Sequence, residues 1–129
     1  MSGYGAVAIE HFTNPRNVGV VETADGLGKD SNPSCGDFTR ITVRIMGGRV
    51  AEARFKTFGC TAAIASASIV TTLAEGRTLD EAAAISAQDV LRALGGLPPE
   101  KEGCALMAAG ALRSALAEAR LNAKARERH

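Results

Sequence analysis

Hydrophobic and polar residues alternate most regularly between residues 38 and 46. Every second position in this stretch is apolar, at Ile41, Val43 and Ile45. This pattern predicts a strand with one buried face. Gly47-Gly48 follows, and because both residues tolerate positive φ, the pair predicts a two-residue hairpin turn. Residues 51–56 then alternate again, which predicts a returning antiparallel strand and a hairpin with one solvated face.

A third strand is predicted at residues 18–24, although Gly19 weakens the pattern there. Residues 30–34 are expected to form a loop leading into the hairpin, since Asn, Pro and Ser favour turns. The strand predicted at residues 18–24 would be the first strand of the sheet. It would follow a short N-terminal helix and the turn at Asn14-Pro15-Arg16.

After Gly59-Cys60 the hydrophobic period becomes helical. Residues 61–75 predict a helix that ends at Gly76. Thr78 with Glu81 has the spacing of a capping box and predicts the start of a short helix. Ser86 with Asp89 predicts another start, and Gly95-Gly96 predicts the end of that helix.

From about residue 104 to residue 120, apolar residues recur at helical spacing, which predicts a long C-terminal helix. Leu97-Pro98-Pro99 cannot continue a helix and is expected to form an extended, exposed elbow before it. Strands followed by helices predict an α+β fold, with helices packed on one face of a small three-stranded antiparallel sheet. Residues 1–129 are predicted to form a single domain with its core at about 8–121, and residues 122–129 are predicted to be a mobile basic tail.

Composition narrows the functional classes. The chain has 15 Lys and Arg against 14 Asp and Glu, and a net charge of +1 gives no reason to expect nucleic acid or an anionic membrane as a partner. Residues 57–74 carry no charge, but their Gly, Cys, Ser and Thr content favours a buried helix over a membrane span. The first eight residues lack the pattern of a secretion signal, so a reducing cytoplasmic location is predicted.

The three cysteines are the candidates for chemistry. Their odd number leaves at least one without an intrachain partner, and in a reducing compartment none is expected to form a disulfide. Cys35 lies two residues before Asp37, whereas Cys60 and Cys104 are each predicted at the start of a helix, where the helix dipole favours a thiolate. Three thiolates and a carboxylate could bind zinc, copper(I) or an iron-sulfur cluster. Because 24 and 43 residues separate the cysteines, which is not a CxxC pattern, spacing alone does not decide between a joint metal site and inert buried thiols.

Several short motifs occur in a characteristic order. They are His11-Phe12-Thr13-Asn14-Pro15-Arg16-Asn17-Val18-Gly19, Cys35-Gly36-Asp37, Phe55-Lys56-Thr57-Phe58-Gly59-Cys60 with Ala63-Ile64-Ala65-Ser66, Thr78-Leu79-Asp80-Glu81-Ala82 and Leu97-Pro98-Pro99-Glu100-Lys101. In this order they closely resemble the IscU/NifU N-domain family of iron-sulfur scaffolds, from His11 to about residue 120.

The resemblance implies a function and a set of roles. The chain would be a scaffold and sulfur acceptor, not an enzyme, on which a [2Fe-2S] cluster is assembled and then transferred to apo-proteins. Cys35, Cys60 and Cys104 would be cluster ligands, and Cys104 would be the first to receive persulfide sulfur. Asp37 would be a further ligand that makes the cluster easier to release.

Partners are implied in the same way. They would be a cysteine desulfurase, a ferredoxin-type electron donor, apo-protein acceptors, and an Hsp70-type chaperone with its co-chaperone. The chaperone would grip Leu97, Pro98, Pro99, Glu100 and Lys101. A homo-oligomer is compatible with the sequence, and the assembly pathway is left open.

One departure from the family pattern concerns Gly103, because many members have His immediately before the third cysteine. His11 is expected to have a packing or docking role, so Asp37 becomes the expected fourth ligand of a Cys3Asp set. The same family includes zinc-containing sulfur acceptors with such a set. The sequence between Cys60 and Cys104 lacks the insertion typical of that branch and so favours the scaffold. Isolated protein could hold iron or zinc in place of the cluster.

Overall fold

The computed structural model describes residues 3–32 and 36–127. Strand β2 (Asp37–Met46) pairs with β3 (Arg49–Phe58) in an antiparallel hairpin, as predicted. The turn between them is made by Gly47 and Gly48, with φ angles of +59° and +76°. The alternating pattern correctly predicted the buried face, since Ile41 and Val43 are completely buried.

The third strand is β1 (Gly26–Asn32), and the strand predicted at residues 18–24 is wrong. Strand β1 pairs with β2, so that the order in the antiparallel sheet is β1-β2-β3. Part of the loop predicted at residues 30–34 therefore belongs to a strand. Its sequence, GLGKDSN, has no β-branched or aromatic residue, and hence gives little strand signal.

Two glycines explain why this poor strand sequence is used. A Cβ atom at Gly28 would lie 2.2 Å from the carbonyl oxygen of Ala111, and one at Gly26 would lie 2.0 Å from that of Ala115. Both carbonyl groups belong to helix α5 (Glu102–Glu127). The glycines therefore allow the backbones of the strand and the helix to approach closely, which a side chain would prevent.

We expect Gly28→Ala to lower the free energy of unfolding by about 1 to 3 kcal/mol, because the added methyl group would overpack the contact between β1 and α5. Urea unfolding measures this change. Ser31→Ala, at an exposed position of the same strand, is the control and should change stability by less than about 0.5 kcal/mol. Equal stability of Gly28→Ala and the parent chain would contradict the close approach.

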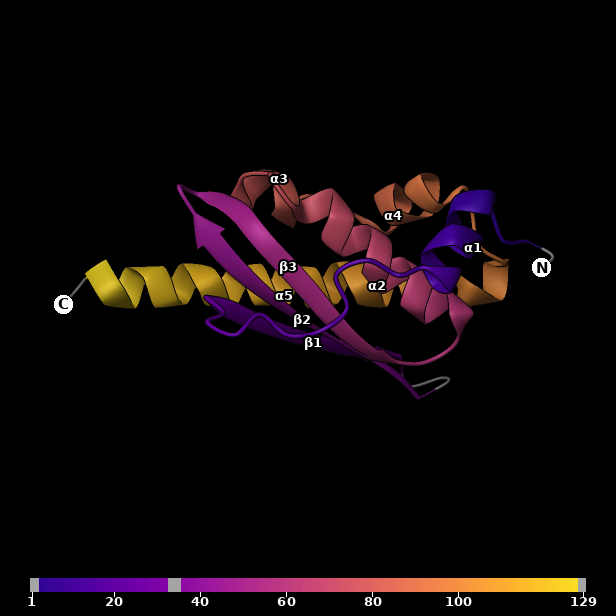
Figure 1. The fold of residues 1–129 in the computed structure, drawn as a ribbon, viewed down its shortest axis with the longest axis horizontal. Coiled ribbons are helices and arrows are strands. Elements are labelled where there is room, and N and C mark those ends of the chain that lie inside the picture. The colour runs from indigo at the N-terminus through magenta and orange to yellow at the C-terminus, as the bar shows by residue number, and fades with distance from the viewer. Residues whose placement is uncertain (1–2, 33–35, 128–129) are drawn as a thin grey trace.

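The segment that was predicted as a strand instead crosses the sheet. Val18 forms a bridge to Phe55 at the free edge of β3, and the amide of Val21 donates to Thr42 Oγ1 at 2.9 Å. The amide of Asp25 then reaches the carbonyl oxygen of Val43. Figure 1 shows this segment passing over the face of the sheet opposite α5. It therefore covers part of the face that was expected to be solvated.

The other face of the sheet is covered by helices, as predicted. Helix α5 packs on β1 and β2, and α2 (Thr61–Ala74) packs on β3. Helices α1 (Ala6–Thr13) and α4 (Ala87–Leu94) pack on α2, while α3 (Leu79–Ala83) contacts α5. Figure 1 shows α5 running along the whole length of the molecule. The core lies between this helical layer and the sheet and is rich in alanine.

The predicted capping box at Thr78 and the predicted helix start at Ser86 are confirmed, and both form capping boxes. Thr78 Oγ1 accepts from the amide of Glu81, whose carboxylate accepts from the amide of Thr78. Ser86 and Asp89 form the equivalent pair at the start of α4. Each pair satisfies two amide groups that the first turn of a helix leaves without partners.

The C-terminal basic segment differs from its prediction. Helix α5 continues to Glu127, and Arg126 forms an ion pair with Asp25 at 3.1 Å. Residues 122–127 are therefore helical, where a mobile tail was expected, and residues 128 and 129 lie outside the described residues. Among the helices in residues 3–32 and 36–127, none combines the length and apolar character that crossing a membrane requires.

The proline elbow is also less exposed than predicted. Leu97 has 6% of its surface accessible and Pro98 is buried, whereas Pro99 and Glu100 are exposed. Pro99–Lys101 forms a short 3-10 helix, η1, that leads directly into α5. The N-terminal segment covers the elbow, since the amide of Gly5 donates to the carbonyl oxygen of Gly96. Pro98 keeps the extended backbone that proline favours, with φ −54° and ψ 143°, while packing of Leu97 into the core buries the elbow.

Candidate metal and sulfur site

Three of the four predicted site residues meet where three elements begin. Asp37 is the first residue of β2, Cys60 is the residue immediately before α2, and Cys104 lies in the first turn of α5. In Figure 1 the starts of α2 and α5 lie at the same end of the molecule, on the right. Cys35 was predicted as the fourth residue and lies outside the described residues.

The donor atoms of these three side chains are within 4.8 Å of one another. The two thiols share one acceptor. Cys60 Sγ lies 3.6 Å and Cys104 Sγ lies 3.7 Å from Asp37 Oδ2. Two ligands of one tetrahedral ion are separated by about 3.4 to 3.8 Å when metal–ligand bonds are about 2.1 to 2.3 Å long. The two sulfur–oxygen distances therefore fit two edges of a tetrahedral site.

Access to the site differs between the two thiols. Cys104 is 1% exposed and Asp37 is 7% exposed, whereas Cys60 is only partly buried. Cys104 lies at a helix start, yet its side chain is closed to solvent in the described conformation. Packing of the first turn of α5 into the core buries this sulfur. Cys60 is the more accessible thiol.

Gly59 allows the acid to reach the thiols. A Cβ atom at this position would lie 2.9 Å from Asp37 Cγ and 2.7 Å from Ala63 Cβ. The chain between β3 and α2 therefore passes close to the carboxylate, and a larger residue would push Asp37 or the first turn of α2 away. The motif Phe58-Gly59-Cys60 thus has a packing reason for its glycine.

Two residues near the thiols were not predicted as part of the site. The negative charge of a Cys60 thiolate beside Lys101 raises the pKa of Lys101, and a hydrogen bond between them acts in the same direction. Burial raises the pKa of Tyr4, and the charge of Cys60 raises it further. The Lys101 ammonium can therefore balance part of the negative charge of a thiolate site.

The described histidine is not part of this site. Asp37, Cys60 and Cys104 form the one group in the described part of the chain that contains at least three metal-binding side chains with converging donor atoms. Gly103 next to Cys104 leaves room for the Asn32 side chain, whose nitrogen would lie 3.1 Å from a Cβ atom there. A side chain at position 103 would require Asn32 to move.

A family model for the NifU-like N-terminal domain matches residues 3–125. The chain belongs to this family. Among curated relatives, the iron-sulfur cluster assembly scaffold protein IscU 1 of Archaeoglobus fulgidus is 46% identical over 115 residues, with coverage of 89% of this chain and 75% of the relative. The scaffold protein IscU of Escherichia coli strain K12 is 41% identical over 119 residues, with coverage of 89% and 92%.

The solved structures agree with the family assignment at the level of the fold. The N-terminal part of a nitrogen-fixing NifU-like protein from Brucella abortus superposes with a TM-score of 0.72 at 16% identity. The superposition covers 91% of this chain and 94% of the Brucella chain. The predicted resemblance to the IscU/NifU N-domain family and the α+β fold are therefore confirmed.

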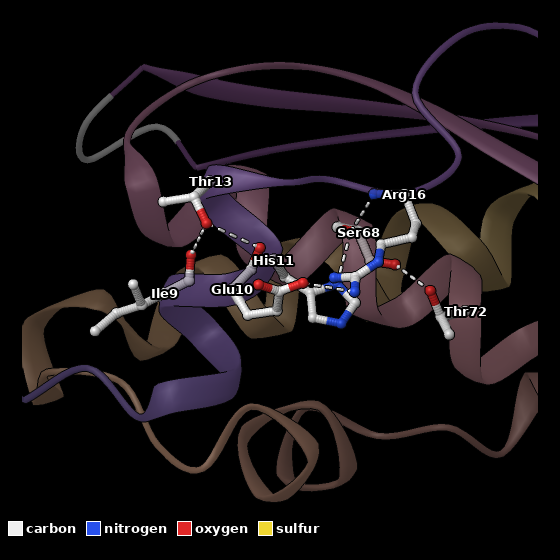
Figure 2. A network of polar contacts seen from close by, with 7 residues as sticks. All are labelled: Ile9, Glu10, His11, Thr13, Arg16, Ser68 and Thr72. Atoms are coloured by element: carbon white, nitrogen blue, oxygen red, sulfur yellow. Dashed lines mark hydrogen bonds and ion pairs between the residues drawn. The ribbon is translucent and has the colours of Figure 1, made fainter.

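The family motif at the N-terminus forms a buried polar contact in this chain. His11 is 6% exposed, and its Nδ1 lies 2.7 Å from Ser68 Oγ. The same hydroxyl accepts from the amide of Arg16 at 2.9 Å. Figure 2 shows His11 of α1 and the turn at Arg16 converging on Ser68 of α2. The predicted packing role of His11 is confirmed, because this contact fastens α1 to α2.

Burial lowers the pKa of His11 below its usual 6.5, and the charge of Arg16 lowers it further. The folded chain therefore binds this proton less readily than the unfolded chain. The stability that neutral His11 contributes to the fold is fully present above about pH 6.5. It is lost as the pH falls toward the pKa that His11 has in the folded chain.

We expect His11→Gln to reduce the loss of stability between about pH 7.5 and pH 5.5. Urea unfolding at both values measures this loss. Glu22→Gln, at an exposed acid, should leave the loss unchanged. An identical pH dependence in His11→Gln and in the parent chain would contradict the role of His11.

Proposed function

We infer that the chain is an iron-sulfur cluster assembly scaffold of the NifU-like family. The observation that carries this conclusion is the convergence of two thiols and one carboxylate, with all donor atoms within 4.8 Å, in a chain 41% to 46% identical to proteins named as such scaffolds. Thiolates are the preferred ligands of iron in iron-sulfur clusters. This donor set supports the proposal.

Asp37, Cys60 and Cys104 are proposed to bind the iron, with Cys35 as the remaining ligand. The cluster is proposed to be of the [2Fe-2S] type. Three donor atoms this close together can all bind one iron ion. Ligands for a second iron ion would have to come from outside this group, or the group would have to rearrange. Lys101 is proposed to balance the negative charge of the thiolates, since it lies beside Cys60.

Sulfur is proposed to arrive as a persulfide made by a cysteine desulfurase. The desulfurase transfers the outer sulfur atom to a cysteine thiolate of this chain, which leaves the enzyme thiolate free. A ferredoxin-type donor then supplies two electrons that break the sulfur–sulfur bond, and sulfide and the cysteine thiolate are released into the iron site. The chain itself supplies the ligands and holds them in position, and its thiols return to their starting state.

Cys104 is proposed as the first persulfide acceptor. Because it is 1% exposed, transfer to this thiol requires the start of α5 to open. The elbow at Leu97 and Pro98 leads directly into that turn, and both residues are buried in the described conformation. Release of the elbow would expose Cys104 and Leu97 together.

The joint exposure of Cys104 and Leu97 would also make the proposed chaperone segment accessible. This segment comprises Leu97, Pro98, Pro99, Glu100 and Lys101. An Hsp70-type chaperone with its co-chaperone would bind the segment only after Leu97 has left the core. Binding would then hold Lys101 away from Cys60 and the start of α5 away from Asp37. Capture of this segment would thus weaken the cluster site at the moment of transfer to an apo-protein.

Anaerobic incubation with ferrous iron, cysteine, a cysteine desulfurase and a reductant tests the function. The expected result is a thiolate-to-iron absorption spectrum that is lost on transfer to an apo-ferredoxin. Persulfide formation without a cluster would support the zinc-containing sulfur carrier and contradict the scaffold. Thiols that acquire neither sulfur nor iron would contradict both functions.

A further inference from the structure

The contact between β1 and α5 changes its character toward the start of the helix. At Gly26 and Gly28 the strand has no side chain, and its backbone lies directly on the helix. Further along the strand the roles are exchanged, because the carboxylate of Asp30 lies where a Cβ atom of Gly110 in α5 would be. Alternate residues of a strand point to the same face, so the next residue of β1 to face α5 is Asn32.

Asn32 is the last residue of β1 and contacts the first turn of α5. A Cβ atom at Gly103 would lie 3.1 Å from Asn32 Nδ2. Outside the helix itself, the atoms of the described residues within 4 Å of that position all belong to Asn32. The next helix residue is Cys104, whose side chain is 1% exposed. Asn32 therefore contacts the turn that has to move before a reagent can reach this thiol.

The backbone of Asn32 is fixed to the segment that carries the acid of the site. Asn32 lies directly opposite Asp37 in the antiparallel pair of β1 and β2. Its carbonyl oxygen accepts from the amide of Gly36 at 2.9 Å. Asp37 in turn accepts from both thiols. Asn32 thus connects the strand that carries the carboxylate with the helix start that carries the buried thiol.

The first turn of α5 gains from such a contact, because glycine favours a helix less than any residue except proline. Space is also available for the contact to break. A hollow of about 210 Å³ is lined by Asp30, Ser31, Asn32, Gly103, Leu106 and Met107. It has room for several water molecules at about 30 Å³ each. The side chain of Asn32 can therefore leave Gly103 without disturbing the contacts at Gly26 and Gly28.

We propose that Asn32 is a positioning residue that holds the start of α5 closed over Cys104. While its amide lies on Gly103, the first turn stays packed and the thiol is out of reach. When the amide moves into the hollow, the turn loses this contact and Cys104 becomes accessible. The inference rests on the proposed function only for the role of Cys104 as the sulfur acceptor. The accessibility that it predicts for this thiol does not depend on whether a cluster forms.

Alkylation with iodoacetamide, followed by peptide mass spectrometry, measures the initial reaction rate at Cys60 and at Cys104 with no desulfurase or iron present. Asn32→Ala should raise the rate at Cys104 at least about fivefold, because a buried thiol reacts in proportion to the population of opened chains. The rate at Cys60 should stay within about twofold of the parent rate, since this thiol is already partly exposed. Asn32→Asp keeps the size of the side chain, and a carboxylate is favoured at a helix start, so this variant should not exceed the parent rate at Cys104.

Gly103→Ala gives an independent measurement of the same contact. Its methyl group takes the place of the Asn32 amide, so adding Asn32→Ala to this variant should change the rate at Cys104 by less than about twofold. Ser31→Ala, at an exposed neighbouring position, is the control and should react like the parent chain. An unchanged rate at Cys104 in Asn32→Ala, or equal acceleration at both thiols, would overturn the proposal. The same acceleration by Asn32→Ala with and without Gly103→Ala would overturn it as well, because the two residues would then act independently.

Discussion

Replacing Asp37 with alanine is expected to slow cluster transfer to an apo-ferredoxin by about tenfold or more. In the free chain, one oxygen of Asp37 accepts from both Cys60 and Cys104. Alanine removes these two contacts from the empty site, and each hydrogen bond is worth about 1 kcal/mol. The loaded site keeps its iron–thiolate bonds and loses only the weaker carboxylate–iron bond, so the iron is then held by thiolates.

The chemical nature of the Asp37 ligand is a second reason to expect slower cluster transfer from the alanine variant. A carboxylate oxygen is harder than a thiolate and binds iron of a cluster less firmly, so Asp37 provides the bond that breaks most readily. Stopped-flow absorption of the transfer reaction gives the rate. Glu22→Ala, at an exposed acid outside the site, should transfer at the parent rate. A parent-like transfer rate in Asp37→Ala would show that this residue does not control release.

Replacing Cys104 with serine is expected to abolish early persulfide formation. The thiol is the proposed first acceptor, and serine provides an oxygen of similar size that forms no persulfide. Incubation with a cysteine desulfurase and cysteine, followed by alkylation and peptide mass spectrometry, locates the sulfur. The parent chain should carry it first on the peptide that contains Cys104.

Cys60→Ser is the matched variant, because Cys60 lies at the same site and is the more exposed thiol. It should retain early persulfide on Cys104. If sulfur appeared first on Cys60, and remained there in Cys104→Ser, accessibility would decide the acceptor and the assignment to Cys104 would be wrong. The comparison also reports whether the start of α5 opens during transfer.

Local patterns were sufficient to predict much of the fold. The alternation in residues 38–46, the Gly47-Gly48 turn, the capping box at Thr78 and the helix start at Ser86 depend on neighbours in the sequence, and all of them are confirmed. Strand β1 could not be predicted in this way. Its glycines are placed by contact with α5, more than 80 residues later in the chain, and such contacts leave no local pattern.

The errors at the elbow and at the C-terminus have similar causes. Leu97-Pro98-Pro99 has the preference of an exposed extended segment, but Leu97 finds space in the core. The basic segment near Lys124 contains good helix formers and continues α5, while Arg126 gains a partner in Asp25. In both segments, tertiary contacts determine the conformation and the burial, which the amino-acid composition alone does not.

The candidate site likewise shows that local sequence patterns do not predict contacts between distant parts of the chain. The positions of Cys60 and Cys104 at helix starts were predicted, but their convergence on Asp37 came from the family resemblance, since 43 residues separate the two thiols. Lys101 was predicted only as part of a chaperone segment. Its spacing of three residues from Cys104 was an available signal, because residues three apart at a helix start lie on the same side.

The most direct test of the scaffold is the amount of iron and acid-labile sulfide bound per chain after anaerobic assembly with a desulfurase. The parent chain is expected to bind both in equal amounts, and Cys60→Ser is expected to bind neither stably, because it removes one of the converging donors. Iron and sulfide bound equally well by Cys60→Ser, or persulfide in the parent chain with no bound iron, would contradict assembly of a cluster at Asp37, Cys60 and Cys104.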